Sequence, residues 1–243
     1  MPVVIFTFGV PGRHIVQRLT QAGCVLLGSA TSAKEAVALE ESGVHAVICQ
    51  GTEAGGHRTS AMLPESGDLG LMSLVPLVKA HTSLPVIAAG GIVNATQIRA
   101  AMAAGADGVS MGTIFLTSKE CSTPQSHRDH IFNLDRDAKT VVTRIFTGRP
   151  ARMLENRFYK EMSAIWQELP ASERDLPWDF YCRDIFGTAA RSNRPDLFIL
   201  WGGQSVNLLA GKPTRPARDI IREIAADMGW SDNNLSTGAA NHE

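Results

Sequence analysis

In the segment VICQGTEAGGHRTS, residues 47–60, an apolar run ends at a glutamine and is followed by a loop with three glycines. The side chains there that could do chemistry are Gln50, Glu53, His57 and Arg58. An imidazole titrates near neutral pH, so His57 is the side chain there best suited to transfer a proton. Glycine lets the backbone approach a ligand closely. The pattern favours a catalytic loop with His57 as general base over the alternative, a flexible surface loop with an incidental histidine.

Two later apolar runs also end in glycine. Gly90 and Gly91 precede a helical pattern that Asn94 can cap, and Gly112 and Thr113 follow the next run. Bare backbone N–H groups at strand ends, close to a helix N-terminus, form an anion pocket. A phosphate site after the last strands recurs in (β/α) barrels. Taken together, these positions predict a site for a phosphorylated ligand, although glycines also serve simply to turn strands into helices.

Alternating strands and helices would position these residues. Apolar runs rich in β-branched residues alternate with helical stretches; Thr31 or Ser32 can cap one of these helices, and Gly43 can end it. Continuous apolar strands separated by helices predict parallel strands buried on both faces, whose carboxyl ends carry the ligand site. The pattern indicates a (β/α) barrel or an open doubly wound sheet. Strands are expected over 3–9, 24–31, 45–51, 84–91 and 107–116, and helices over 12–23, 32–43, 70–82 and 94–105.

The composition changes after residue 118. Residues 1–118 carry the barrel pattern, whereas residues 119–195 are richer in charge and aromatic side chains and predict a helical cap subdomain. Its main helices are expected over 155–169 and 177–190. Residues 196–230 predict a return to the barrel and a final amphipathic helix, and the polar segment 231–243 predicts a disordered tail.

The totals argue against several classes of protein. The chain has 243 residues, a net charge of −1 and 44% hydrophobic residues, which is ordinary for a soluble globular protein. This balance gives no reason to expect nucleic acid or a membrane surface as a partner, and no apolar run reaches the roughly 18 residues of a membrane span. Four well-separated cysteines and unpaired histidines predict free thiols, a reducing cytoplasm and no metal.

Six segments occur in a recognisable order: VVIFTFGVP, VICQGTEAGGHR, PVIAAGGI, GADGVSMGTIFLTSKE, FTGRPARMLENRF and LWGGQSVNLLAG. In these segments the chain resembles the nitronate monooxygenase family, formerly called 2-nitropropane dioxygenases. The resemblance extends over most of residues 2–212, and QGTEAGGH is its most specific block. It implies an α/β fold of the TIM-barrel (β/α)8 type with bound FMN. The implied reaction is the oxidation of alkyl nitronates or nitroalkanes by O2 to a carbonyl compound and nitrite.

The resemblance also implies roles for single residues. His57 matches the family's catalytic histidine, which removes the α-proton of a neutral nitroalkane. Gln50 and Gly55 match FMN contacts at the end of the third strand, and Gly91 matches a phosphate contact. The stretch that holds the ribityl phosphate corresponds to Ser110, Met111, Gly112 and Thr113.

The resemblance begins at the family's fourth barrel strand, so the three βα units before it have no counterpart in this sequence. Five parallel strands cannot close an eight-stranded barrel, and the two open edges of an incomplete barrel are candidates for self-association. Two alternative functions stay open. One is an NAD(P)H-dependent reductase of quinones or enoyl thioesters on the same flavin barrel. The other is an inactive remnant that binds a phosphorylated ligand or a partner chain.

Other polar positions carry further expectations. Glu53 has two candidate roles, to orient His57 or to fix the loop through backbone N–H groups. Arg58 is interpreted as a solvated side chain. The segment TGRPARMLENRF predicts arginines that anchor the cap to barrel loops, with a phosphate contact as the alternative. Gln204, in WGGQS, is expected to face the interior near the site.

Overall fold

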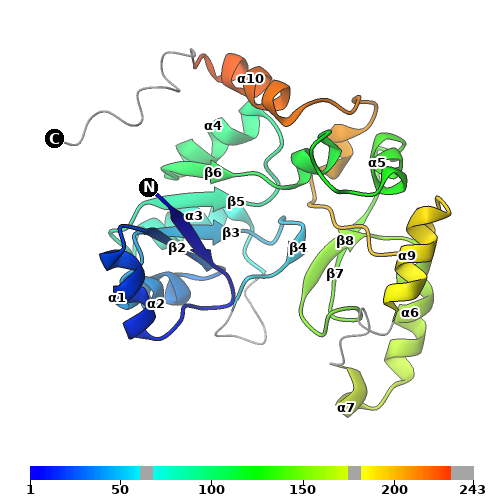
Figure 1. The fold of residues 1–243 in the computed structure, drawn as a ribbon, viewed down its shortest axis with the longest axis horizontal. Coiled ribbons are helices and arrows are strands. Elements are labelled where there is room, and N and C mark those ends of the chain that lie inside the picture. Colours follow the sequence, from blue (N-terminus) through cyan, green and yellow to red (C-terminus); the bar gives the residue numbers. More distant parts are fainter. Residues whose placement is uncertain (61–67, 175–181, 231–243) are drawn as a thin grey trace.

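Five parallel strands form the main sheet of the computed structural model, which describes residues 1–60, 68–174 and 182–230. Their order across the sheet is β1-β2-β3-β5-β6 (Figure 1). The five parallel strands of the sequence prediction are therefore confirmed. The strands are β1 (Val3–Phe6), β2 (Val25–Ala30), β3 (Ala46–Gln50), β5 (Val86–Ala89) and β6 (Gly108–Ser110).

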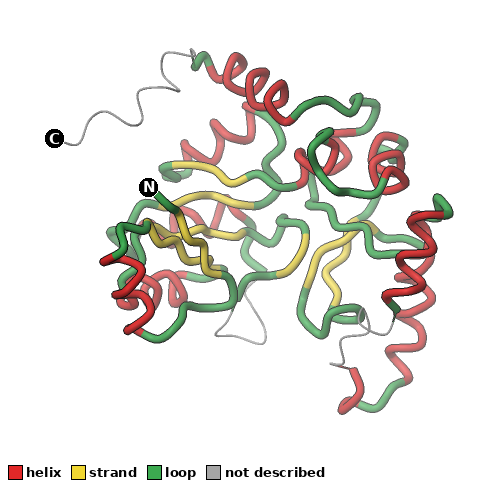
Figure 2. The backbone as a smooth tube through the Cα atoms, in the orientation of Figure 1, coloured by secondary structure: helices red, strands yellow, loops and turns green. Residues whose placement is uncertain are grey.

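Helices α1 to α4 cover one face of this sheet, and the main apolar core lies between the two layers (Figure 2). Leu26, Val47 and Val86 point from the strands into this core and are fully buried. The predicted helix ends are confirmed: the Ser32 side chain caps α2, which ends at a left-handed Gly43, and Asn94 caps α4. The helices are α1 (Arg13–Gln21), α2 (Ala33–Ser42), α3 (Leu71–Lys79) and α4 (Ala95–Ala103).

The register of the sheet brings three strand ends together. Gln50 at the end of β3 pairs with Ala89 of β5, and Ala89 pairs with Ser110 of β6. All strands of a parallel sheet point the same way, so the loops after β3, β5 and β6 leave from one edge. This edge carries the polar and glycine residues singled out in the sequence.

The main sheet does not close into a barrel within the residues that the structure describes, because β1 pairs with β2 alone and β6 with β5 alone. Val3 and Ile5 on the β1 edge are each 57% exposed. The face away from the helices carries a small apolar cluster of Leu27, Ala46 and Ile48. Self-association through these edges stays a prediction.

A second, antiparallel sheet lies beside the first, with strand order β4-β8-β7. Its strands are β4 (Gly56–His57), β7 (Thr140–Thr143) and β8 (Ala151–Leu154). Two of them fall in the segment 119–195, which the sequence predicted as mainly helical. The β-branched run TVVT favours a strand, and all four residues of β8 are buried, so β8 lacks the alternation that marks a half-exposed strand.

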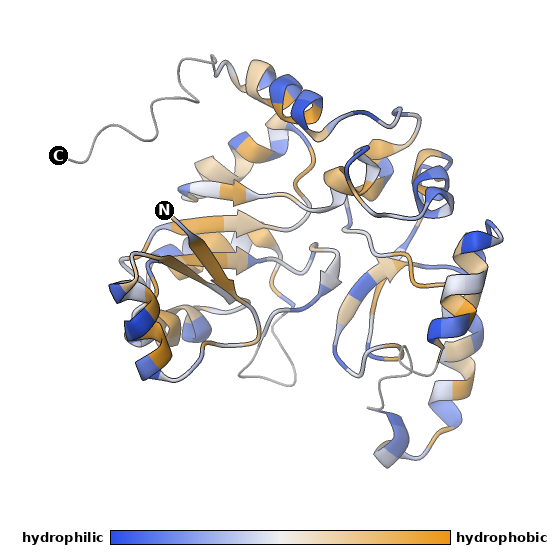
Figure 3. Cartoon of the chain, viewed as in Figure 1, coloured by the Kyte–Doolittle hydropathy of each residue, from blue (hydrophilic) through white to orange (hydrophobic). Residues whose placement is uncertain are grey.

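The other regular elements described in the segment 119–195 are helices, as expected, and its boundaries as a subdomain stay a prediction. In the segment 119–195, polar turns separate the strands and helices. The strands of the main sheet are more apolar than β7 and β8 (Figure 3). The helices after β6 are η1 (Thr113–Thr117), α5 (Gln125–Phe132), α6 (Arg157–Glu168), α7 (Ala171–Arg174), α9 (Arg183–Arg191), η2 (Pro195–Leu197), η3 (Val206–Leu209) and α10 (Ala217–Met228). The start of the helix predicted over 177–190 and the tail over 231–243 lie outside the described residues.

Strand β6 is shorter than predicted. The sequence pattern extends to residue 116, but the strand ends at Ser110 and the chain turns into the 3-10 helix η1 at Thr113. Its neighbour β5 stops at Ala89, so residues beyond Ser110 have no strand to pair with. The consequence is that Gly112 and Thr113 begin a short helix at the edge of the sheet instead of extending β6.

Candidate functional site

Gln50 closes the base of the loop between β3 and β4. Its side-chain Nε2 donates to the backbone carbonyl of His57 (2.9 Å), and its Oε1 accepts from the backbone N–H of Thr59 (3.0 Å) and from Arg58 Nη1 (3.1 Å). The residue is buried, so these bonds satisfy a polar group that has left water. Gln50 therefore ties the position of His57 to the end of β3.

Two buried arginines hold the same loop by its carbonyl groups. Arg58 donates to the backbone carbonyls of Gln50 and Gly51, and Arg152 on β8 donates to that of Thr52 (2.8 Å). Arg58 is only 4% exposed, so its interpretation as a solvated side chain is wrong. Burial lowers the pKa of both guanidinium groups, and the charge of Arg152 lowers that of Arg58 further. Arg152 thus has the anchoring role expected of its segment.

Glu53 fixes the loop, and among the described residues it forms no hydrogen bond with His57. Its two carboxylate oxygens accept from the backbone N–H of Leu71, at 2.8 and 3.0 Å, at the start of α3. A carboxylate is stabilised there by the positive end of the helix dipole. Of the two roles considered from the sequence, the structure favours fixing the loop.

His57 lies in β4, and aromatic rings flank its imidazole. Its backbone pairs with Ala151 of β8, and its Nε2 lies 3.0 Å from Thr147 Oγ1. The ring centroid lies 5.9 Å from that of Phe8 and 5.6 Å from that of Trp201. The imidazole is therefore half-buried in a mainly apolar setting, with a hydroxyl at one of its nitrogens.

A cavity of about 180 Å³ lies at the ends of β3, β5 and β6. Six of the seven predicted cofactor residues line it; Met111 does not, and packs instead against the main core. The cavity is small for a whole drug-sized ligand, for which pockets of about 300–1,000 Å³ are usual, but suits a phosphate group and its neighbouring atoms. The predicted residues that line it are Gln50, Gly55, Gly91, Ser110, Gly112 and Thr113.

Glycine is required at two positions in the cavity wall. A side-chain carbon at Gly55 would lie 2.6 Å from the backbone of Gly202 and Gly203. Gly91 has φ +66°, and a side-chain carbon there would lie 2.9 Å from Cβ of Glu53. Gly112 differs, because nothing lies within 4 Å of the carbon that a side chain would add. It leaves open space where a side chain would reduce the cavity.

Backbone N–H groups are available at this cavity. In the described part of the chain, those of Gly91, Ile92 and Gly112 have no hydrogen-bond partner within the protein. Thr113 Oγ1 accepts from the backbone N–H of Gly203 (3.0 Å), which leaves the hydroxyl hydrogen to donate to a ligand. Unpaired donors beside a helix N-terminus favour an anionic oxygen, so these residues fit a phosphate group.

The sequence placed WGGQS near the site but did not identify which of its residues line the cavity. Ser205 Oγ donates to the backbone carbonyl of Gly91 (2.6 Å) and accepts from Gln97 Nε2 (2.9 Å). Gly203 and Ser205 both line the cavity, whereas Gln204 between them is exposed, so its expected interior position is wrong. The sequence signal for this contact is the pair of glycines in WGGQS, because two residues without side chains let the segment approach Gly55.

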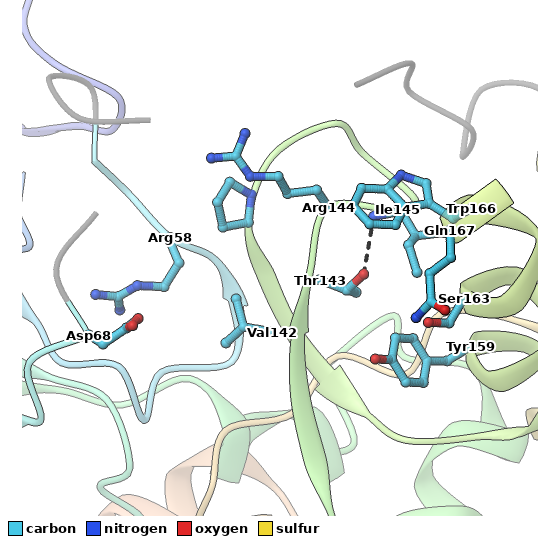
Figure 4. Close-up of a pocket in the computed structure, with 11 residues that line it drawn as sticks. Arg58, Asp68, Val142, Thr143, Arg144, Ile145, Tyr159, Ser163, Trp166 and Gln167 are labelled. Carbon is cyan, nitrogen blue, oxygen red and sulfur yellow. Dashed lines mark hydrogen bonds between the residues drawn. The ribbon is translucent and has the colours of Figure 1, made fainter. Parts of the chain in front are cut away.

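A larger pocket, of about 480 Å³, lies between β7, α6 and the residue after β4. Figure 4 shows Arg58 and Asp68 on one side of it, and Tyr159 and Ser163 of α6 on the other. None of the predicted cofactor residues lines this pocket. The smaller cavity is therefore the better candidate, because the residues singled out from the sequence meet there.

Other classes of site are absent from the residues that the structure describes. No group of three or more His, Cys, Asp or Glu side chains is placed to hold a metal ion. None of the helices in those ranges has the length and apolar character needed to cross a membrane. Within the described residues the cysteines form no disulfide.

Comparison with known sequences gives one consistent family. The family model described as Nitronate monooxygenase matches residues 1–227. A protein from Staphylococcus aureus called "Probable nitronate monooxygenase" is 41% identical over 227 residues, which are 92% of this chain and 62% of that protein. The chain thus spans less than two thirds of the length of this relative.

Comparison with solved structures agrees. A nitroalkane oxidase from Streptomyces ansochromogenes superposes with a TM-score of 0.84 at 38% identity, over 97% of this chain and 66% of that one. FabK from Thermotoga maritima superposes with a TM-score of 0.72 at 29% identity, over 94% of this chain and 68% of that one. The five strands and their helices therefore have the arrangement found in these proteins.

Proposed function

The chain belongs to the nitronate monooxygenase family, and on that basis we propose that it provides the FMN phosphate site and the catalytic base of an enzyme that oxidises nitronates. The substrates are alkyl nitronates or nitroalkanes together with O2, and the products are a carbonyl compound and nitrite. The nitroalkane oxidase superposition supports this choice of substrate class. Bound FMN supplies the redox chemistry, and the protein supplies position and proton transfer.

The phosphate of FMN is held by backbone groups in this proposal. The N–H groups of Gly91, Ile92 and Gly112 and the hydroxyl of Thr113 donate to its oxygens. Gln50 lines the same cavity from the end of β3. The absence of side chains at Gly91 and Gly112 lets the phosphate reach the backbone.

His57 acts as the general base. It removes the α-proton from a neutral nitroalkane and so converts it to the nitronate, the form that is oxidised. The rings of Phe8 and Trp201 exclude water from one part of its surroundings. A preformed nitronate has already lost this proton, so its oxidation does not need the base.

One observation carries the proposal. Gln50 lines the cavity of the predicted cofactor residues and also donates to the backbone carbonyl of His57 (2.9 Å). A single buried side chain thus joins the candidate phosphate site to the candidate base. Cofactor and proton acceptor are held at a fixed separation, as a reaction between them requires.

The first test is a visible absorbance spectrum of the purified, desalted chain before and after FMN is added. A retained flavin band is expected, with turnover of nitronate. A colourless chain that takes up no FMN would contradict the proposal for this polypeptide and favour the alternative of an inactive remnant.

The second test separates the role of His57 from general damage. We expect His57→Ala to lower nitroalkane turnover by about 10²- to 10⁴-fold while FMN binding and activity on preformed nitronate are retained. His81→Ala, at an exposed histidine, is the matched control and should change neither rate. An equal loss on both substrates would show that His57 is not mainly a base.

The competing hypothesis is an NAD(P)H-dependent reductase of quinones or enoyl thioesters on the same cofactor site. The two hypotheses differ in their electron donor. Reduction of the bound flavin by NADH without nitronate would favour the reductase, whereas reduction by nitronate alone favours the oxidation proposed above.

A further inference from the structure

We propose that Thr147 is a positioning residue that sets the tautomer of His57, with the hydrogen of the neutral imidazole on Nε2 and the proton-accepting lone pair on Nδ1. This inference rests on the proposed function, since it specifies which atom of His57 receives the substrate proton. It concerns the turn between β7 and β8, for which the sequence suggested only anchoring or a phosphate contact.

The hydrogen bonds of Thr147 carry the argument. Its Oγ1 donates to the backbone carbonyl of Arg149 (3.1 Å) and lies 3.0 Å from Nε2 of His57. A hydroxyl has one hydrogen, and here that hydrogen is given to the carbonyl. The contact with His57 therefore requires Nε2 to donate, because Oγ1 can only accept. In a neutral imidazole the other nitrogen, Nδ1, then holds the lone pair.

A closed set of contacts holds Thr147 and His57 in the orientation that this hydrogen bond requires. The guanidinium carbon of Arg149 lies 4.4 Å from the centre of the Phe8 ring, and Phe8 packs edge-on against His57. This set of contacts thus runs from His57 to Thr147, Arg149 and Phe8 and back to His57. The Trp201 ring, tilted by 40° to the imidazole, packs against it as well. Rotation of the imidazole to exchange its nitrogens would break contacts on more than one side.

The backbone at Phe8 is unusual in a way that fits this arrangement. Phe8 has φ +64°, a left-handed conformation that costs a bulky residue about 1–2 kcal/mol. Its N–H donates to the backbone carbonyl of Thr59 (3.2 Å), two residues after His57. Strained residues persist where surrounding contacts hold them, and they concentrate at functional sites. Phe8 is therefore held against the imidazole at an energetic cost.

The direct test is ¹⁵N NMR of the full chain labelled at histidine, because protonated and unprotonated imidazole nitrogens have well-separated chemical shifts. His57→Gln assigns the resonances of His57. At a pH where the ring is neutral, we expect the wild type to show Nε2 protonated and Nδ1 unprotonated. Thr147→Val keeps the shape and removes the acceptor, and should give a mixture of tautomers. Thr147→Ser keeps the hydroxyl and should match the wild type.

The NMR result does not depend on activity, so it separates the two proposals. A chain that binds no FMN but shows the expected tautomers would overturn the proposed function and leave only the assignment of the His57 tautomer to Thr147. A wild type with Nδ1 protonated, or a Thr147→Val variant with unchanged His57 resonances, would overturn the inference. The resonances of the other histidines report whether either variant has lost its fold.

A kinetic measurement adds a second readout on the FMN-loaded chain. Thr147→Val should lower turnover of neutral nitroalkane by about 10- to 100-fold, because part of the base is in the wrong tautomer. Turnover of preformed nitronate should change less than about twofold, since no proton is removed. Thr147→Ser should restore nitroalkane turnover, and failure of this rescue would contradict a role for the hydroxyl.

Discussion

The cavity at the strand ends and the surroundings of His57 lie next to each other and are built in opposite ways. The cavity is bounded mainly by backbone, where Gly55, Gly91 and Gly112 leave room for a ligand. The imidazole of His57 is held by side chains, including Thr147 and Phe8. A site for an anion needs exposed N–H groups, whereas a base needs a fixed orientation and an apolar setting.

The same contrast predicts which changes each region tolerates. Adding atoms should damage the cavity, because its shape depends on missing side chains. Removing polar or aromatic atoms should damage the His57 region, because its geometry depends on them. A further difference is that buried His127 contacts the backbone of Trp201, beside His57, which makes that region sensitive to acid.

The largest effect is expected from Gly55→Ala. The added methyl group would lie 2.6 Å from the backbone of Gly202 and Gly203, which cannot rotate aside as a side chain can. We expect the free energy of unfolding to fall by about 3 kcal/mol, measured by urea denaturation. FMN uptake should be lost as well. A variant with the stability of the wild type would show that this backbone contact does not define the cavity wall.

An intermediate effect is expected from acid, through His127 on α5. Burial lowers the pKa of His127 to about 4, and it is held against the backbone of Trp201, whose ring flanks His57. A folded-state pKa below the ordinary value gives stability that is present above about pH 6.5 and is lost as the pH falls towards 4. The free energy of unfolding should drop by about 2 kcal/mol between pH 7 and pH 5 from this group alone.

The check is the pH dependence of urea denaturation for wild type and His127→Phe. The variant has no imidazole to protonate at this position, so its slope between pH 7 and pH 5 should be smaller. His130 also has a pKa lowered by burial and should contribute in the same direction. Equal slopes in wild type and variant would locate the acid sensitivity elsewhere.

The smallest effects distinguish two glycines within the cavity. Gly91→Ala introduces a side chain at φ +66° and close to Glu53, and should cost about 1–2 kcal/mol of unfolding free energy. Gly112→Ala meets no atom within 4 Å and should stay within about 0.5 kcal/mol of the wild type. Gly112 lines the cavity, so the affinity for FMN should fall all the same. Fluorescence titration with FMN compares the two, and unchanged affinity in Gly112→Ala would remove Gly112 from the phosphate site.

Much of the fold could be predicted because its pattern is local. Apolar runs that alternate with capped helices predicted all five strands of the main sheet, and Ser32 and Asn94 are the caps. The end of β6 could not be predicted in this way, since it depends on where the neighbouring β5 stops. Strands β7 and β8 were missed because each has only four residues and lies in a segment rich in helical patterns, and β8 is buried along its whole length.

The same distinction between local patterns and long-range contacts applies to the candidate site. That Gln50, Gly55, Gly91 and Gly112 meet at one cavity could be predicted, because polar residues and glycines follow successive strand ends. Arg58 was misjudged, since a cation in a polar loop predicts solvent exposure, and only the three-dimensional structure shows that backbone carbonyls surround it. The glycine pair in WGGQS indicated this segment, but the sequence does not show its partners. Gly203 contacts Thr113 and Ser205 contacts Gly91, which are 90 and 114 positions apart in the chain.

Those two long-range contacts have a consequence for biosynthesis. A chain leaves the ribosome from its N-terminus, so β1 to β6 emerge well before the segment that closes the cavity. Gly203 and Ser205 become available only after residues 1–202 have been made. The cavity is therefore completed late in synthesis, and a product arrested before Gly203 would carry the parallel strands without a finished ligand cavity.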